Sequence, residues 1–100
     1  MNPREVLWTK SRIGNGSLNV VYGDSEDAVF SIAIMQWEGV PRVGLRWNNC
    51  GKQGKGYPVG AFGRPQWFII PKEMALAYAK QLNDVIIIEK IKATSDDPLV

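Results

Sequence analysis

The residues of this chain that could do chemistry lie mainly between Gly39 and Lys72. This stretch carries six lysines and arginines and contains no aspartate or glutamate. Its cations and aromatic residues alternate along the chain as Arg42, Arg46, Trp47, Lys52, Lys55, Tyr57, Phe62, Arg64, Trp67, Phe68 and Lys72. Basic side chains neutralise phosphates, and aromatic rings stack on unpaired bases. The pattern favours single-stranded over duplex nucleic acid, because the sequence carries no helix-turn-helix or other groove-reading motif.

A glycine-rich segment, GKQGKGYPVGAFGRPQW, occupies residues 51–67 at the centre of this stretch. A phosphate-binding P-loop would need a serine or threonine after its lysine and a helix immediately afterwards, and both are missing here. The dinucleotide-binding fingerprint fails for the same reason of context. We therefore interpret residues 48–66 as a long binding loop in which glycines form turns and allow close backbone approach. The predicted nucleic-acid contacts are Arg42, Arg46, Lys52, Lys55, Tyr57, Phe62 and Arg64.

Residues suited to catalysis are sparse. The chain has no histidine and a single cysteine, Cys50, so it offers no Ser-His or Cys-His pair and no zinc ligand cluster. Three acidic residues cluster at Asp24, Glu26 and Asp27, where a solvated turn is a simpler reading than a calcium loop. We predict a protein that is not an enzyme and that uses no metal or cofactor.

Length and composition are those of one small globular domain. The chain has 100 residues, of which 45% are hydrophobic and 22% are charged, and its net charge is +2. One cysteine cannot form an internal disulfide. The N-terminal residues have no signal-peptide core, and the longest apolar runs are far shorter than the roughly 20 residues of a membrane span. We expect a single domain over residues 1–100, located in the cytoplasm.

Hydrophobic periodicity predicts an α+β domain with one mainly antiparallel sheet of five to six strands and one amphipathic helix. A hairpin around the Asn-Gly turn is expected over residues 5–22, and a helix is expected to begin at Pro71. The other strands are predicted at Ala28–Trp37, Arg42–Trp47, Gln66–Ile70 and Val85–Ile91. The element order is β-β-β-β-β-α-β, and residues 94–100 are expected to form a flexible tail.

Strand alternation assigns side chains to faces. Along Arg42–Trp47, Trp47 shares a face with Val43 and Leu45, so we expect it in the core. The opposite face, with Arg42 and Arg46, is predicted to meet water or a polyanion. At least one of Trp67 and Phe68 should be buried, which leaves Tyr57 and Phe62 as the better candidates for exposed aromatics.

A family pattern spans about residues 37–82. Its residues are Trp37, Gly39, Pro41, Arg42, Leu45, Arg46 and Trp47, then Gly54, Lys55 and Gly56, and finally the segment PKEMALAYAKQL. This pattern resembles the prokaryotic branch of the positive-cofactor-four type of single-stranded-DNA-binding domains. The resemblance implies a curved antiparallel sheet backed by a helix, a homodimer, and single strands bound along basic, aromatic sheet faces. It implies that Arg42, Arg46 and Lys55 are contacts.

Single-stranded DNA or RNA is thus the expected partner, and two alternatives stay open. The chain could be a protein-interaction module that pairs with a partner through the 48–66 loop and the predicted strand Val85–Ile91. It could instead bind a small ligand in a pocket between sheet and helix, lined by Trp37, Trp47 and Trp67.

Overall fold

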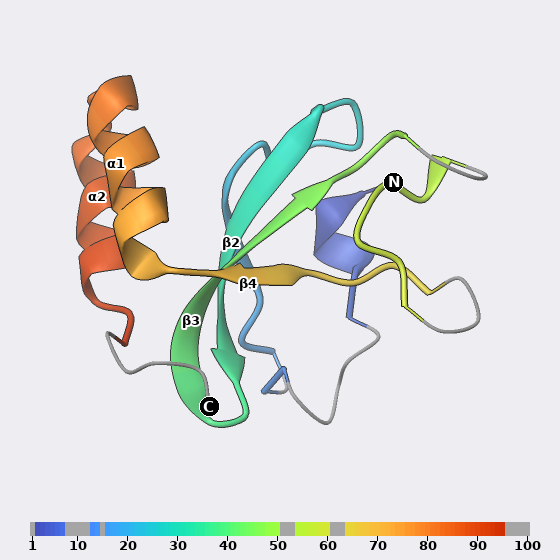
Figure 1. Cartoon of the computed structure of the whole chain (residues 1–100), viewed down its shortest axis with the longest axis horizontal. Coiled ribbons are helices and arrows are strands. Elements are labelled where there is room, and N and C mark those ends of the chain that lie inside the picture. The colour runs from blue at the N-terminus through green and yellow to red at the C-terminus, as the bar shows by residue number, and fades with distance from the viewer. Residues whose placement is uncertain (1, 8–12, 15, 51–53, 61–63, 96–100) are drawn as a thin grey trace.

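The chain folds into a four-stranded antiparallel sheet followed by two helices (Figure 1). A computed structural model describes residues 2–7, 13–14, 16–50, 54–60 and 64–95. The strands are β1 (Asn19–Tyr22), β2 (Phe30–Trp37), β3 (Val40–Trp47) and β4 (Phe68–Ile70), in that order across the sheet. The helices are the 3-10 helix η1 (Pro3–Glu5), α1 (Lys72–Leu82) and α2 (Val85–Lys92). The α+β class and the antiparallel sheet are confirmed, but the described residues form four strands rather than five to six, and two α-helices rather than one.

The hairpin of β2 and β3 forms the centre of the sheet. Its register runs without interruption from the pair Phe30–Trp47 to the pair Trp37–Val40. Glu38 and Gly39 make the turn, and both have positive φ angles, 52° and 82°, which suits the right-handed twist of the strands. The strands predicted at Ala28–Trp37 and Arg42–Trp47 are confirmed in position. The register fixes which side chains share a face.

One face of the sheet, here called the helix face, packs against α1 and α2. Its buried side chains are Ile32, Val43, Ala75, Ala79, Ile87 and Ile91. Rings of Tyr22, Phe30 and Tyr78 meet beside them, with centroids 5.2–5.7 Å apart. The buried residues of α1 and α2 recur four positions apart, as expected for amphipathic helices.

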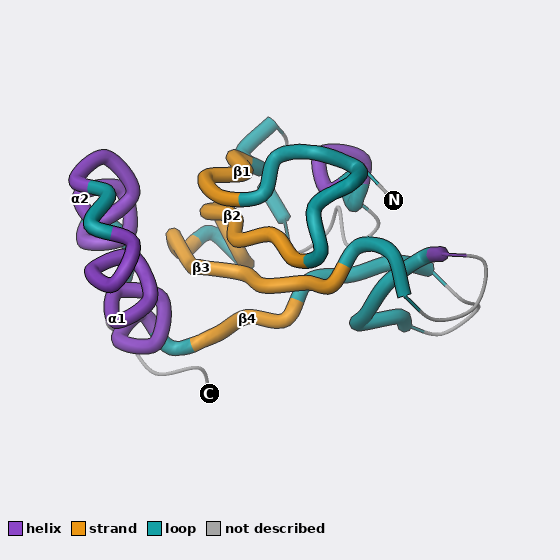
Figure 2. Tube along the Cα trace, turned by 90° about the horizontal axis from the view of Figure 1, so that it is seen from above, coloured by secondary structure: helices purple, strands orange, loops and turns teal. Residues whose placement is uncertain are grey.

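The other face, here called the back face, is also covered. Its buried apolar side chains are Val6, Ile13, Ala33, Met35 and Trp67. The indole Nε1 of Trp67 donates a hydrogen bond of 3.0 Å to the carbonyl oxygen of Val6, which ties the N-terminal segment to the chain before β4. Figure 2 places the helices and the N-terminal segment on opposite sides of the strands.

The prediction that the Arg42–Arg46 face of β3 meets solvent is therefore wrong. Arg46 and Gly44 are buried, and Arg42 is half-buried. A built Cβ on Gly44 would lie 2.6 Å from Met35 and 3.3 Å from Trp67, so these side chains press directly on the strand. Alternation identified the face correctly, but the N-terminal segment and Trp67 that cover it are remote in sequence.

The strand predicted at Val85–Ile91 is wrong, because this segment is the helix α2. The carboxylate of Asp84 caps the helix by accepting hydrogen bonds from the backbone N–H groups of Ile86 and Ile87, both at 3.1 Å. Ile87 and Ile91 are buried four residues apart, on one side of the helix. Packing of this stripe overrides the β propensity of the isoleucines.

The chain ends differ in detail from the prediction. Only the second arm of the expected 5–22 hairpin is a described strand, β1, and its partner is β2. Residues 8–12 and 15 of that prediction lie outside the described residues. Pro71 precedes α1 as its cap residue rather than opening the helix. Of the expected tail 94–100, Thr94 is buried and the Ser95 N–H donates to the carbonyl of Pro41, while residues 96–100 are not described.

Candidate nucleic-acid interface

Three half-exposed aromatic side chains share the helix face beyond the reach of the helices. Trp47 is 43% exposed, Tyr57 is 50% exposed and Phe68 is 49% exposed. Phe68 lies opposite Leu45, two residues before Trp47 on the same side of β3, and Tyr57 lies opposite Trp47. We call these three residues the aromatic face. The prediction that Trp47 is core is wrong, whereas the expectation that Tyr57 is exposed is confirmed.

Backbone hydrogen bonds position Tyr57 beside β3. The Trp47 N–H donates to the Tyr57 carbonyl at 2.8 Å, and the Tyr57 N–H donates to the Trp47 carbonyl at 2.9 Å. Such a reciprocal pair places the two side chains on the same face of the sheet. Gly56 precedes Tyr57 with a φ of +72°, and a Cβ there would lie 1.8 Å from the Trp47 carbonyl oxygen. The approach therefore requires glycine.

The described part of the predicted 48–66 loop contains a short hairpin. The Gly60 N–H donates to the Arg64 carbonyl at 2.8 Å, and the Gln66 N–H donates to the Pro58 carbonyl at 3.0 Å. Val59 and Pro65 form an isolated bridge between the two arms. We call the described residues 55–60 and 64–66 the loop hairpin. Its described arms are built by backbone pairing that the glycine-rich sequence alone did not predict.

Arg46 lies inside the protein, where its guanidinium contacts both arms of the loop hairpin. Its Nη1 donates to the Gln66 carbonyl at 2.7 Å, and its Nη2 donates to the Lys55 carbonyl. The side chain has 0% exposure, and its pKa is lowered by burial, an effect opposed by the nearby Cys50. The structure therefore does not place Arg46 where it could meet a phosphate at the surface.

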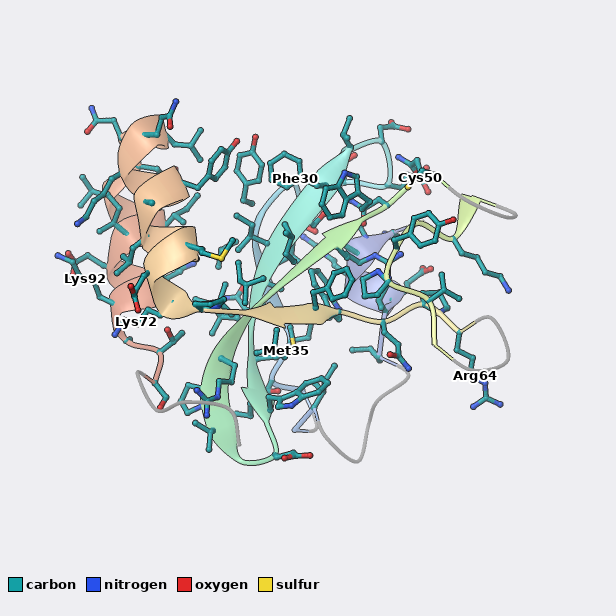
Figure 3. All side chains as sticks on the ribbon, in the orientation of Figure 1. Phe30, Met35, Cys50, Arg64, Lys72 and Lys92 are labelled. Atoms are coloured by element: carbon teal, nitrogen blue, oxygen red, sulfur yellow. The ribbon has the colours of Figure 1, made fainter. Side chains whose placement is uncertain are left out.

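The other predicted contacts are divided among different places. Arg42 lies opposite Met35 on the back face, away from the aromatic face. Lys55 and Arg64 are half-buried in the loop hairpin, and Figure 3 shows Arg64 extending away from the ribbon at the end farthest from the helices. Lys52 and Phe62 lie outside the described residues. The structure thus brings Lys55 and Arg64 to the same end as Tyr57, and leaves Arg42 and Arg46 on the other face.

A buried polar pair fixes the chain where it leaves β3. The Asn48 Nδ2 donates to the Ala28 carbonyl at 3.0 Å and to the Ser31 Oγ at 2.7 Å. The Ser31 hydroxyl in turn donates to the Gly23 carbonyl at 2.6 Å. Asn48 has 0% exposure, so it is a structural residue that sequence reasoning missed. The position of Asn48 directly after a predicted strand is the sequence feature that could have identified it, since asparagine is a common turn residue there.

The acidic turn between β1 and β2 is solvated, as predicted, because Asp24, Glu26 and Asp27 are exposed. Asp24 accepts hydrogen bonds from the Arg4 guanidinium, at 2.7 Å and 2.9 Å from Nε. The hydrogen bond from Arg4 lowers the pKa of Asp24, partly offset by burial and supported by the charge of Arg4. Negative charge is therefore placed at the turn before β2, and positive charge is placed on the loop hairpin.

The three tryptophans of the proposed ligand pocket do not share one site. Trp37 and Trp67 belong to the back face, whereas Trp47 is on the helix face. A pocket between sheet and helix lined by all three is therefore wrong. Over the described ranges, no group of three or more histidine, cysteine, aspartate or glutamate residues could hold a metal ion. The Cys50 thiol is exposed.

The chain matches no protein-family model, no curated protein and no solved structure. Of the helices in the part of the chain that the structure describes, none has the length and apolar character needed to cross a bilayer.

Proposed function

We propose that this protein binds single-stranded nucleic acid on the aromatic face, with Trp47, Tyr57 and Phe68 as stacking residues. The observation that carries the proposal is that three large aromatic side chains are about half exposed on one face of a sheet. An aromatic ring on an open sheet surface offers a flat partner to an unpaired base, and each stacked base contributes roughly 1–3 kcal/mol. Such binding tolerates many sequences because every base has a π face.

The charge distribution supports a position for the phosphates of the bound strand. Lys55 lies two residues before Tyr57, and Arg64 lies on the other arm of the loop hairpin. The acidic turn with Asp24, Glu26 and Asp27 lies at the start of β2. A polyanion is attracted to the first group and repelled by the second. Phe30, which follows the acidic turn, and Tyr57, in the loop hairpin, lie on opposite sides of Trp47. We infer that the phosphates of the strand lie on the loop-hairpin side of Trp47.

The resemblance to the positive-cofactor-four type of single-stranded-DNA-binding domains agrees with this proposal. It implies an antiparallel sheet backed by a helix and single strands on aromatic sheet faces. It differs in the contacts, because it would use Arg42 and Arg46 on the back face. We assign the contacts to the aromatic face in place of these two arginines, and we keep Lys55, which the resemblance also implies.

The proposal is tested by fluorescence anisotropy with labelled single-stranded and duplex oligonucleotides at low and moderate salt. We expect tighter, salt-dependent binding of the single strand. Trp47→Ala and Phe68→Ala should each weaken it by about 1–3 kcal/mol, or roughly 5- to 150-fold. Lys55→Met should reduce the slope of log affinity against log salt by about 0.7. Met74→Ala is the matched control, because Met74 is a large apolar side chain that is also exposed, at 59%, but belongs to α1 rather than to the aromatic face.

Two results would overturn the proposal. One is the absence of single-strand binding at the lower salt concentration. The other is binding that Trp47→Ala, Phe68→Ala and Met74→Ala leave equally unchanged, because the aromatic face would then play no part.

We also propose that the protein forms a homodimer through the turn between α1 and α2. Val85 is 66% exposed and Ile86 is 69% exposed, and Leu82, just before the turn, is also exposed. Adjacent apolar side chains in water favour burial against a second surface. The interaction-module alternative rested on the 48–66 loop and on a strand at Val85–Ile91. It would use this helical patch in place of the strand, since that segment is α2.

Light scattering coupled to size-exclusion chromatography tests the dimer. We expect a mass of two chains for the unmodified protein and of one chain for Ile86→Glu. A glutamate at this position in the first turn of α2 is favourable for the helix dipole, so the helix should remain intact. A monomer for the unmodified protein, or an unchanged dimer for the variant, would contradict the proposal.

A further inference from the structure

Arg46 combines features that do not suit a surface phosphate contact. The sequence predicts it as a nucleic-acid ligand, yet its side chain has 0% exposure. Its guanidinium donates to two backbone carbonyls, those of Lys55 and Gln66. Burying a charged group without such partners is costly, so the side chain and the loop hairpin depend on each other.

We propose that Arg46 is a positioning residue, which holds the loop hairpin against the end of β3 and thereby keeps Tyr57 opposite Trp47. The part of this inference that concerns ligand binding rests on the proposed function. The part that concerns the position of the loop hairpin stands on the geometry alone.

The two carbonyls that Arg46 contacts belong to the first and last residues of the loop hairpin in sequence. The Lys55 carbonyl comes just before Gly56 and Tyr57, and the Gln66 carbonyl comes just before the buried Trp67. One planar guanidinium with several donors in a fixed fork can bridge two such acceptors. A lysine ammonium keeps the charge but lacks this fork, so it cannot hold both arms in the same way.

Gly56 lies against the Arg46 guanidinium, and its lack of a side chain leaves room for the hydrogen bond from Arg46 to the Lys55 carbonyl. A Cβ at this position would lie 2.6 Å from the Arg46 Nη2 and 1.8 Å from the Trp47 carbonyl oxygen. The Gly56 N–H also donates to the Cys50 carbonyl at 2.7 Å. Replacing Gly56 should therefore displace the loop hairpin while leaving Arg46 itself unchanged, which gives a second and independent variant.

Amide hydrogen exchange of the free protein tests the position of the loop hairpin. In Arg46→Lys, the Trp47 and Tyr57 amides should exchange at least about tenfold faster, because local opening becomes easier. The Ala33 and Gly44 amides, at the centre of the β2–β3 hairpin, should keep their rates. Arg42→Lys is the matched control, since Arg42 lies on the same strand and face but opposite Met35, and it should alter neither pair of amides.

Gly56→Ala should reproduce the local pattern of Arg46→Lys, because its Cβ displaces the same segment. Arg46→Gln, which is neutral and keeps one amide donor group, carries the test if Arg46→Lys does not fold. Unchanged exchange at Trp47 and Tyr57 in a folded variant overturns the inference. So does an equal rise at Ala33 and Gly44, because Arg46 would then support the whole fold rather than the loop hairpin.

Binding and amide exchange of Arg46→Lys together separate positioning from direct contact. If Arg46 only touched a phosphate, Arg46→Lys would keep the charge and would leave the exchange rates of the Trp47 and Tyr57 amides unchanged. If Arg46 positions the loop hairpin, the affinity for a single-stranded oligonucleotide should fall toward that of Tyr57→Ala. Retained affinity overturns the positioning role in binding. If the unmodified protein binds no oligonucleotide, the proposed function fails, while the exchange experiment still decides the role of Arg46 in the loop hairpin.

Discussion

Arg46 and Trp47 are neighbours on β3, and their side chains differ sharply in burial because they lie on opposite faces of the sheet. On the back face Arg46 has 0% exposure, whereas on the helix face Trp47 is 43% exposed. The usual distribution would bury the tryptophan and expose the arginine. The N-terminal segment and Trp67 pack on the back face and the loop hairpin binds Arg46, whereas α1 and α2 leave Trp47 partly uncovered on the helix face. What covers a residue decides its burial, and the incomplete cover leaves aromatic rings available to a ligand.

The largest difference in stability is expected between substitutions of two tryptophans, one from each face of the sheet. Trp67→Ala should lower the free energy of unfolding by about 3–5 kcal/mol, because a buried ring and its hydrogen bond to Val6 are lost. Trp47→Ala should cost about 1 kcal/mol, because much of its ring already meets water. Urea denaturation followed by circular dichroism measures both. Equal losses would remove the contrast between the two faces.

A smaller effect should come from the cap of α2, the second helix that covers the helix face. Asp84→Ala should lower the free energy of unfolding by about 1 kcal/mol, because the first turn of α2 loses its side-chain acceptor. Asp84→Asn keeps an acceptor oxygen and is the control. If the alanine variant matched both the stability and the helical circular dichroism of the unmodified protein, the cap would have no role in stabilising α2 against the helix face.

The smallest effect concerns the ion pair of Arg4 with Asp24, which joins the N-terminal segment on the back face to the β1–β2 turn. The hydrogen bond from Arg4 lowers the pKa of Asp24, so the pair stabilises the fold above the ordinary carboxyl pKa. This contribution is lost as the pH falls below about 4 and through the lowered pKa.

Denaturation at several pH values should therefore show a slightly smaller acid loss of stability for Asp24→Asn than for the unmodified protein. High salt should reduce the difference, because both side chains are exposed. Glu26→Gln, in the same turn, is the control. A larger acid loss in Asp24→Asn would contradict the assigned direction of the pKa shift.

Local patterns predicted the centre of the sheet correctly. Period-2 alternation and a short turn are enough to specify β2 and β3, since each strand pairs with its neighbour in sequence. The final segment was harder, because its β-branched residues favour a strand while Asp84 and the spacing of Ile87 and Ile91 favour a helix. The aspartate before the segment and the four-residue spacing of the two isoleucines are the sequence signals that identify the helix.

The candidate site could be predicted only in part. The sequence pointed to the end of β3 and to the loop, and Tyr57 was expected to be exposed. It did not predict that Arg46 is interior, because its partners are carbonyls of Lys55 and Gln66, which reach it only when the loop hairpin folds back. It placed Trp47 in the core, because alternation gives a face and does not tell how far the helices extend along it.

The position of Cys50 has a practical consequence. It is the chain's single cysteine, its thiol is exposed, and its carbonyl accepts the hydrogen bond from Gly56 at the root of the loop hairpin. A thiol-reactive fluorophore or spin label will therefore attach at one defined place without any engineered substitution. Such a label would report on the environment of the loop hairpin, beside the surface on which the ligand is expected to bind.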